Sequence, residues 1–185
     1  MEIVPTELDG PRVVIPRVIE DERGFFLEAF RRSLFAEEGI EFDPVQQNHS
    51  RSHRGVVRGM HFQYGDGVAK LVRCVNGAIL DVVVDIRPDS PTFGQWEGFE
   101  LSGENLRQVF CPVGFAHGFC VLSESADVLY DQSAYYDPEL DAGFRWDDPE
   151  VGIEWPADLE LECSPKDAEA PSLSELKESL PFRTD

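Results

Sequence analysis

One stretch of the chain, from Arg58 to Arg73, combines residue types that could bind an anion and move a proton. It reads R-G-M-H-F-Q-Y-G-D-G-V-A-K-L-V-R and contains His61 and Lys70. Because side chains alternate along a strand, Arg58 and His61 need a bulge or a twist to converge, and Gly59 permits one. Basic groups gathered on a sheet face would be costly in a core. In a pocket they would form a site for an anionic substrate that must lose a proton.

The simpler interpretation is a polar sheet face that happens to carry basic residues. A second segment, Pro112–Phe119, weakens it, because P-V-G-F-A-H-G-F places His117 between apolar residues after a Pro-x-Gly turn. Ionisable groups in apolar surroundings tend to be functional. The two segments together predict a pocket that contains both histidines.

The elements that would position these residues are predicted to be short strands. Turn signals such as Asn76-Gly77, Pro88–Pro91 and Ser102-Gly103 recur at short spacing, while long helical periodicity is nearly absent. Many short strands with regular punctuation are typical of an antiparallel sandwich or barrel. The predicted strands are Val13–Ile15, Phe25–Phe30, Val56–Phe62, Lys70–Val75, Ala78–Ile86, Gly94–Leu101, Arg107–Cys111, Gly118–Leu122 and Asp127–Gln132.

Two short helices are also predicted. One covers Ser33–Glu38 and ends at Gly39, and the other covers Ser172–Leu180 with a serine as its N-cap. The segment Asp137–Pro171, rich in Asp, Glu and Pro, is predicted to be an ordered loop. Its apolar anchors are Trp146, Ile153 and Trp155. Since no repeat, low-complexity tract or linker divides the chain, residues 1–185 are expected to form a single domain.

Composition indicates a soluble globular protein of 185 residues with 42% hydrophobic and 28% charged residues. No apolar run approaches the roughly 20 residues needed to span a bilayer. The N-terminus has neither a basic region nor an apolar core typical of a signal peptide, so a cytoplasmic location is expected. The four cysteines form no C-x-x-C pair, which favours buried thiols in a reducing compartment over disulfides or a zinc site.

The net charge of −20 restricts the possible partners. The chain has 36 acidic and 16 basic residues, and such a surface repels nucleic acid and anionic membranes. We therefore expect neither as a partner. An acidic composition with few lysines indicates adaptation to high salt, where self-repulsion is screened over roughly 3 Å at 1 M. The alternative is an ordinary acidic cytosolic protein.

Several sequence blocks, spread over nearly the whole chain, occur together and in order in one known family. The blocks are D-E-R-G-F-F-L-E (Asp21–Glu28), Q-Q-N-H-S-R-S (Gln46–Ser52), R-G-M-H-F-Q (Arg58–Gln63), K-L-V-R (Lys70–Arg73), D-V-V-V-D-I-R (Asp81–Arg87), S-P-T-F-G-Q-W (Ser90–Trp96), P-V-G-F-A-H-G-F (Pro112–Phe119), L-Y (Leu129–Tyr130) and S-P-K-D (Ser164–Asp167). In these blocks the chain resembles the dTDP-4-dehydrorhamnose 3,5-epimerases, which are sugar-nucleotide isomerases. The resemblance implies an all-β fold, a cupin-type antiparallel jelly roll with a few short helices.

The resemblance also implies a reaction that inverts C3 and C5 of a nucleotide-linked 4-ketosugar through enolate intermediates. Neither step is a redox change, so no cofactor is expected, and the chain has no G-x-G-x-x-G motif. By the resemblance, His61 is the general base and Asp167 is the carboxylate that fixes its tautomer and raises its basicity. Tyr130 is the acid on the opposite face of the sugar, and Lys70 stabilises the enolate oxygen.

Substrate-binding residues carry over from the family in the same way. Arginines among them suit bidentate phosphate recognition, and Tyr136 matches an aromatic residue that stacks on the thymine. The family also implies a homodimer in which an N-terminal strand adds to the partner's sheet and brings Arg23 or its neighbours to the partner's pocket. The implied binding residues are Arg23, Glu28, Gln46, Gln47, Asn48, Arg58, His117, Tyr136, Asp141 and Lys166.

The chain departs from the family pattern at two positions near the implied pocket. Gly67-Val68-Ala69 precede Lys70, where a glutamine two positions before the lysine is common, and this change could alter a sugar contact. Asp131 follows Tyr130 where lysine is frequent, which would remove a positive charge near the pocket.

Three other functions remain as alternatives. A metal-dependent cupin would need an H-x-H pair, whereas this chain has His61-Phe62-Gln63, and His117 alone cannot hold a catalytic metal. We therefore expect no metal. A noncatalytic cupin that only binds sugar nucleotides would not need both an acid and a base. A single-site epimerase, which inverts only C3 or only C5, stays open.

Overall fold

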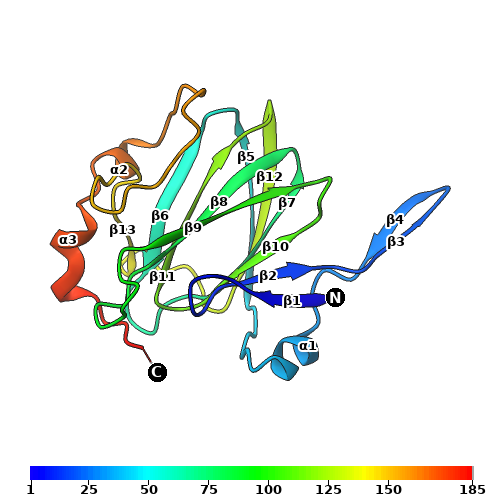
Figure 1. Cartoon of the computed structure of the whole chain (residues 1–185), viewed down its shortest axis with the longest axis horizontal. Helices are drawn as coiled ribbons and strands as arrows, with labels where there is room; N and C mark the ends of the chain where they lie inside the picture. Colours follow the sequence, from blue (N-terminus) through cyan, green and yellow to red (C-terminus); the bar gives the residue numbers. More distant parts are fainter. Residues whose placement is uncertain (185) are drawn as a thin grey trace.

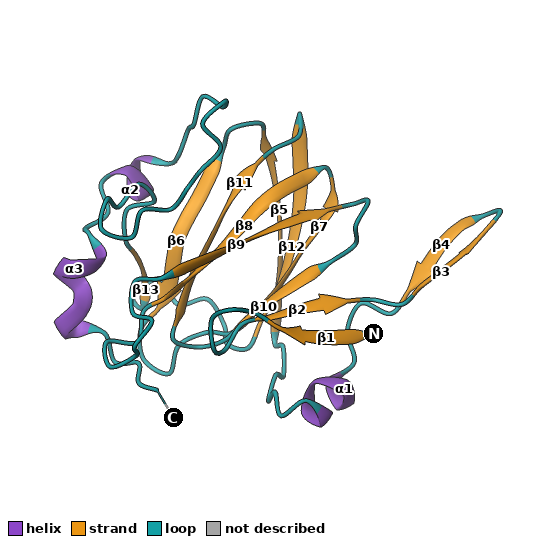
Figure 2. Ribbon diagram, in the orientation of Figure 1, coloured by secondary structure: helices purple, strands orange, loops and turns teal. Residues whose placement is uncertain are grey.

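The computed structural model describes residues 1–184, which form two facing antiparallel sheets with short helices at their margins (Figures 1 and 2). The six-stranded sheet has the order β1 (Glu2–Pro5), β2 (Arg12–Ile15), β10 (Gln108–Cys111), β7 (Lys70–Asn76), β12 (Ser125–Gln132) and β5 (Gln46–His53). The five-stranded sheet has the order β13 (Asp141–Gly143), β6 (Val57–Gln63), β11 (Phe115–Val121), β8 (Ala78–Asp85) and β9 (Trp96–Ser102). This arrangement confirms the predicted antiparallel jelly roll.

The main core fills the space between the two sheets. Residues of β7, β10 and β12 meet residues of β8, β9 and β11 there, and Val72 and Val128 belong to one core cluster with Phe119 and Leu101. A second cluster covers the outer face of the five-stranded sheet with the C-terminal segment, including Phe144 and Leu180. Strand β8 is therefore buried on both faces, which accounts for its nearly continuous apolar sequence.

The helices cover the outer faces of the sheets. Helix α1 (Arg32–Glu37) packs Phe35 against the six-stranded sheet, while α2 (Pro165–Ala168), α3 (Leu173–Leu176) and the 3-10 helix η1 (Lys177–Ser179) lie beside the five-stranded sheet. Both expected helices occur, but the second is split into α3 and η1, with Ser172 and Glu175 forming a capping box. No helix within residues 1–184 is long and apolar enough to cross a membrane.

Several elements differ from the sequence prediction. All nine predicted strands occur with shifted ends, but β1, β3 (Val18–Asp21), β5 and β13 were not predicted. The predicted strand Phe25–Phe30 stops at Leu27, as β4 (Gly24–Leu27). The expected loop Asp137–Pro171 is ordered but contains β13 and α2, so it is not a loop throughout. Strands β1, β3 and β13 have only three or four residues, and β5 is held by pairing with the distant β12, so none of them leaves a clear local pattern in the sequence.

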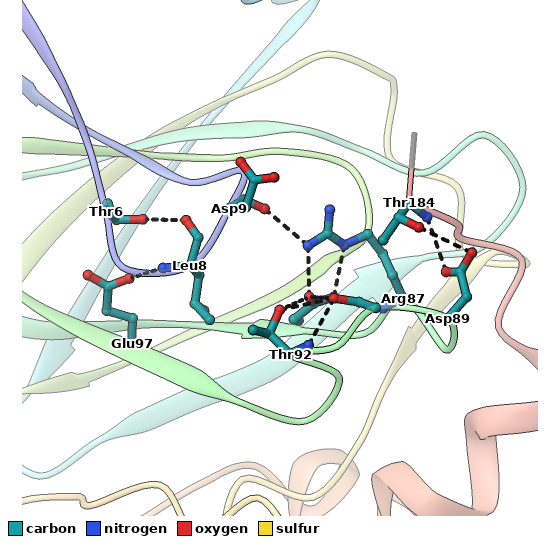
Figure 3. Close-up of polar contacts among 10 residues, drawn as sticks. Thr6, Leu8, Asp9, Arg87, Asp89, Thr92, Glu97 and Thr184 are labelled. Carbon is teal, nitrogen blue, oxygen red and sulfur yellow. Dashed lines mark hydrogen bonds and ion pairs between the residues drawn. The ribbon is translucent and has the colours of Figure 1, made fainter.

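The loop before β2 and the C-terminal segment are fastened to the β8–β9 connection by polar contacts (Figure 3). Arg87 donates to the backbone oxygen of Asp9 over 3.0 Å, and the backbone N–H of Thr184 donates to Asp89 over 3.1 Å. Glu97 accepts a hydrogen bond of 3.1 Å from the backbone N–H of Leu8. These contacts hold the loop before β2 and the C-terminal segment against β9 and the connection that precedes it.

The hairpin of β3 and β4 projects away from the two sheets (Figure 1). Its apolar side chains Ile19, Phe25 and Phe26 are 54%, 57% and 69% exposed. Large exposed apolar side chains gathered on one arm are typical of a protein interaction surface.

Salt should stabilise this fold. Like charges on the surface repel one another, and the exposed carboxylates include Glu20, Glu22, Glu37, Glu38 and Glu41. Screening at molar salt would relieve that repulsion more than it weakens short-range buried pairs. We expect the melting temperature, followed by circular dichroism, to rise between low and molar KCl. Activity should be maintained over the same range. Maximum stability in dilute buffer, with activity falling steadily as salt is added, would contradict the salt-adapted interpretation.

Candidate active site

A cavity between the two sheets gathers most of the residues predicted for the site. Its walls come from β5, β7 and β12 of one sheet and from β6 and β11 of the other, with the segment around β13 at its mouth. The lining residues are Asn48, Arg58, His61, Lys70, His117, Phe119, Tyr130, Gln132, Tyr136 and Asp141.

Arg58 and His61 reach this cavity together because β6 is irregular between them. His61 pairs with His117 in β11 and Arg58 pairs with Phe119, so two steps along β11 match three along β6. Gly59 lies in this irregular part with a φ of 139°, and a Cβ there would lie 2.6 Å from the Cα of Gly118. The bulge or twist expected between Arg58 and His61 is thus present as a shift in the strand register.

His61 is held by a buried carboxylate. Its Nε2 lies 2.7 Å from Oδ1 of Asp167, whose side chain is only 6% exposed, while that of His61 is 34% exposed. Helix α2 positions Asp167, and its N-cap Ser164 accepts a hydrogen bond from the Asp167 backbone N–H over 3.1 Å. Burial alone would raise the pKa of Asp167, but the hydrogen bond and charge of His61 lower it below its ordinary value. Asp167 is therefore ionised at neutral pH and can orient the imidazole.

Lys70 and Tyr130 enter the cavity from the six-stranded sheet, opposite β6. Lys70 is 8% exposed, and its Nζ donates to the backbone oxygen of His61 over 3.4 Å. Burial lowers the pKa of Lys70, against the charges of nearby acidic groups. Burial also raises the pKa of Tyr130, with the charge of Arg58 acting in the opposite direction. A phenol with a raised pKa keeps its proton at neutral pH, so it can act as a proton donor.

A second histidine–carboxylate pair lies beside the first. Nε2 of His117 is 2.8 Å from Oδ2 of Asp81, a fully buried residue on β8. Oδ1 of Asp81 has no hydrogen-bond partner among residues 1–184. The sequence analysis did not single out Asp81, although a carboxylate within the apolar run D-V-V-V-D is a usable signal, since a buried charge needs a partner. It also missed Phe119 and Gln132.

Two predicted residues, Tyr136 and Asp141, lie at the mouth of the cavity, and two more, Lys166 and Gln46, contact them. The hydroxyl of Tyr136, which is 53% exposed, donates to Asp141 over 3.3 Å, and Lys166 forms an ion pair with the same carboxylate. Gln46 lies next to Asn48 and accepts a hydrogen bond of 2.9 Å from the backbone N–H of Tyr136.

Five predicted binding residues do not line the cavity of their own chain: Gln46 and Lys166 contact residues at its mouth, and Arg23, Glu28 and Gln47 lie farther away. Arg23 lies at the tip of the projecting hairpin and pairs with Asp21, and Glu28 pairs with Arg31. Gln47 lies on the outer face of its sheet, where it donates to Asp131 over 2.7 Å. Strand alternation turns both Gln47 and Asp131 away from the cavity, so the aspartate after Tyr130 does not line it.

No group of three or more His, Cys, Asp or Glu side chains within the described part of the chain is arranged to hold a metal ion. Gln63, at the position of the second histidine of an H-x-H pair, instead accepts a hydrogen bond of 3.1 Å from the backbone N–H of Asp137.

Known epimerases of dTDP-linked sugars resemble this chain in sequence and in fold. The sequence profile described as dTDP-4-dehydrorhamnose 3,5-epimerase matches residues 5–175. The enzyme of that name from Salmonella typhimurium is 48% identical over 177 residues, covering 95% of this chain and 97% of the relative. The crystal structure of the dTDP-6-deoxy-D-glucose-3,5-epimerase of Legionella pneumophila, in complex with dTDP-4-keto-L-rhamnose, superposes with a TM-score of 0.95 at 45% identity, covering 100% of this chain and 98% of the other. A dTDP-4-dehydrorhamnose 3-epimerase from Streptomyces niveus is 41% identical over 181 residues, covering 97% of this chain and 87% of the relative.

Proposed function

The chain belongs to the dTDP-4-dehydrorhamnose 3,5-epimerase family, and from this we propose that it epimerises dTDP-4-dehydro-6-deoxy-D-glucose at C3 and C5 to give dTDP-4-dehydro-L-rhamnose. The reaction would serve the synthesis of dTDP-rhamnose and related deoxysugars. The observation that carries the proposal is the pairing of His61 with Asp167 on one wall of the cavity that Tyr130 and Lys70 line from the facing sheet.

Each residue has a defined role in this proposal. The imidazole of His61, oriented by Asp167, removes the proton from a carbon next to the C4 ketone, and the electron pair moves onto the C4 oxygen. The ammonium of Lys70 stabilises that enolate oxygen. The phenol of Tyr130 then returns a proton to the opposite face of the carbon, which inverts its configuration. Before the second carbon reacts, His61 releases the proton it took to solvent and Tyr130 regains one from solvent. Repetition at that carbon then completes the reaction without a net gain or loss of protons or electrons.

Substrate binding is assigned by the same reasoning. Arg58, whose Nε donates to Ser52 over 2.9 Å, is oriented to bind the diphosphate, and the exposed ring of Tyr136 at the mouth of the cavity is available to stack on the base. Asn48, His117 and the neighbouring Gln46 would contact the sugar. Lys166 and Asp141 neutralise each other at the mouth, so Arg58 and Lys70 supply most of the positive charge inside.

Proton NMR of the purified product tests the proposal. Inversion of both carbons of dTDP-4-dehydro-6-deoxy-D-glucose supports the 3,5-epimerase. A product inverted at one carbon would support the second candidate, a single-site epimerase. The 41% identity to a 3-epimerase is the reason to test for that outcome. An unchanged sugar would indicate a protein that only binds nucleotide sugars. For any of these outcomes we predict a cytoplasmic location.

Activity should be insensitive to chelators, because proton transfer is assigned to His61 and Tyr130 alone. We expect the rate after exhaustive dialysis against EDTA to equal the untreated rate, with a metal-dependent enzyme treated in parallel as the control. A loss of activity that a divalent metal restores would revive the metal-dependent cupin as an alternative.

We further propose a homodimer in which the β3–β4 hairpin packs on the partner. Burial of Ile19, Phe25 and Phe26 would remove the largest exposed apolar group of the arm from water. The edge strand β1 would be covered in the same contact. Arg23, at the hairpin tip, would then reach the partner's cavity, which accounts for its distance from its own. Sedimentation at working salt should give a dimer, and Phe26→Ser should weaken it.

Mixed dimers provide a sharper test of this arrangement. Arg23→Ala and His61→Ala should each impair activity, while a mixed dimer of the two should regain one intact site that takes Arg23 from one subunit and His61 from the other. A fully active monomer, or mixed dimers without regained activity, would contradict the exchange.

A further inference from the structure

Gln132 is a cavity residue to which neither the family blocks nor the mechanism above gives a role. It is 5% exposed and lines the cavity from β12, two residues after Tyr130 and therefore on the same face of the strand. Gln46 of β5 pairs with it on one side and Lys70 of β7 on the other. Side chains paired in this way lie about 5 Å apart at Cβ. Gln132 is thus the immediate neighbour of the lysine that would hold the enolate oxygen.

A chain of hydrogen bonds determines which way the Gln132 amide points. The backbone N–H of Tyr136 can only donate, and it donates to Oε1 of Gln46 over 2.9 Å. Nε2 of Gln46 must then be the donor to Oδ1 of Asn48, at 2.9 Å. Nδ2 of Asn48 in turn donates to Oε1 of Gln132, and Nε2 of Gln46 reaches the same oxygen at 3.4 Å. Oε1 of Gln132 is therefore an acceptor for two amides, which leaves Nε2 as the free end.

The free end of this amide is available to a ligand. No hydrogen bond from Nε2 of Gln132 forms within residues 1–184. The fully buried side-chain atoms without a partner in that part of the chain are Ser50 Oγ and Asp81 Oδ1, so Nε2 is not sealed inside the core. A donor that has been oriented by three other groups and left unpaired beside Lys70 is suited to stabilise an oxyanion.

We propose that Nε2 of Gln132 donates a hydrogen bond to the C4 oxygen of the substrate and, with Lys70, stabilises the enolate. This assignment rests on the proposed epimerase function and adds a neutral second donor to it. The proton stays on the amide, so the step changes only the charge stabilisation of the oxygen. Because the enolate formed from C3 and that formed from C5 place their charge on the same C4 oxygen, both exchanges depend on this donor.

Two substitutions test the role. Gln132→Met keeps the approximate shape and removes the donor together with the acceptor of Asn48 and Gln46, and we expect exchange of solvent deuterium at both carbons to slow by about 10- to 100-fold. This is less than the roughly 10²–10³-fold loss for an oxyanion donor without a neighbour, because Lys70 remains. Gln132→Glu keeps an acceptor for Asn48 and Gln46 but turns a carboxylate toward the enolate, so its loss should be larger. Affinity for dTDP should stay within about twofold in both, since the nucleotide does not contact the C4 oxygen.

The matched controls are Gln95→Met and Gln95→Glu, at an exposed glutamine of the β8–β9 connection, and both should exchange at the wild-type rate. Wild-type exchange in both Gln132 variants, slowing at one carbon only, or a parallel loss of dTDP affinity and melting temperature would each overturn the assignment. Should Gln132→Met not fold, Gln132→Glu still decides, since it preserves the acceptor. An absence of exchange in the wild type would refute the epimerase function itself, which separates that failure from a failure of the Gln132 role.

Discussion

His61→Asn and His61→Ala are expected to lower proton exchange at both C3 and C5 by about 10²–10⁴-fold while leaving dTDP binding nearly intact. His61 lines the cavity and has a buried carboxylate partner, Asp167, at 2.7 Å, so it combines access to the sugar with a fixed tautomer. His117 is also paired, with Asp81, but it is nearly buried. The loss should therefore not be compensated by the second histidine.

Exchange rates and dTDP affinity measured on the same preparations separate catalysis from binding in these variants. His53→Asn is the matched control, because His53 is exposed at the end of β5 and pairs with the exposed Glu162. It should exchange at the wild-type rate. If His61→Ala retained half of the wild-type activity, the base would have to be another residue.

Lys70→Met is expected to lower turnover by about 10²–10³-fold, the loss typical of an oxyanion donor. The aliphatic part of lysine and the side chain of methionine have similar lengths, so packing among the buried neighbours should survive. Because Lys70 is only 8% exposed, its interaction with a developing oxyanion is poorly screened by water. The effect should appear in kcat, since charge on the C4 oxygen develops only as the proton leaves.

Lys177→Met provides the control for loss of a lysine, because Lys177 lies 4.7 Å over the ring of Phe93, remote from the cavity. Steady-state rates with dTDP-4-dehydro-6-deoxy-D-glucose measure both variants. A Lys70→Met enzyme within a few-fold of wild-type kcat, or one in which only KM changed, would remove Lys70 from the stabilisation of the enolate.

The sequence was most informative where local pattern and chemistry coincide. Apolar alternation between Gly and Pro turns predicted the nine strands that form the walls of the sandwich, and Gly59 predicted the bulge that brings Arg58 and His61 together. These features depend on neighbours in the chain. The roles of the site residues, in contrast, came from the family resemblance and remain predictions.

Strand β5 shows why other elements were missed. Its sequence Q-Q-N-H-S-R-S-H has no apolar residue, because one face lines the cavity with amides and the other faces outward. Its strand form comes from pairing with β12, which the local sequence does not encode. Helix α2 is a different case, since Ser164 followed by Pro165 is a recognisable N-terminal signal for a helix. The position of Arg23 far from the cavity follows from the projecting hairpin, which has no counterpart in local pattern.

The most direct measurement counts deuterium in the sugar after incubation of the purified protein with dTDP-4-dehydro-6-deoxy-D-glucose in heavy water. Proton abstraction by His61 and return of a solvent-derived proton by Tyr130 predict one deuterium at C3 and one at C5 in the wild type, and almost none at either carbon in His61→Ala. Deuterium at neither carbon of the wild type, or the same incorporation in His61→Ala, would contradict the account.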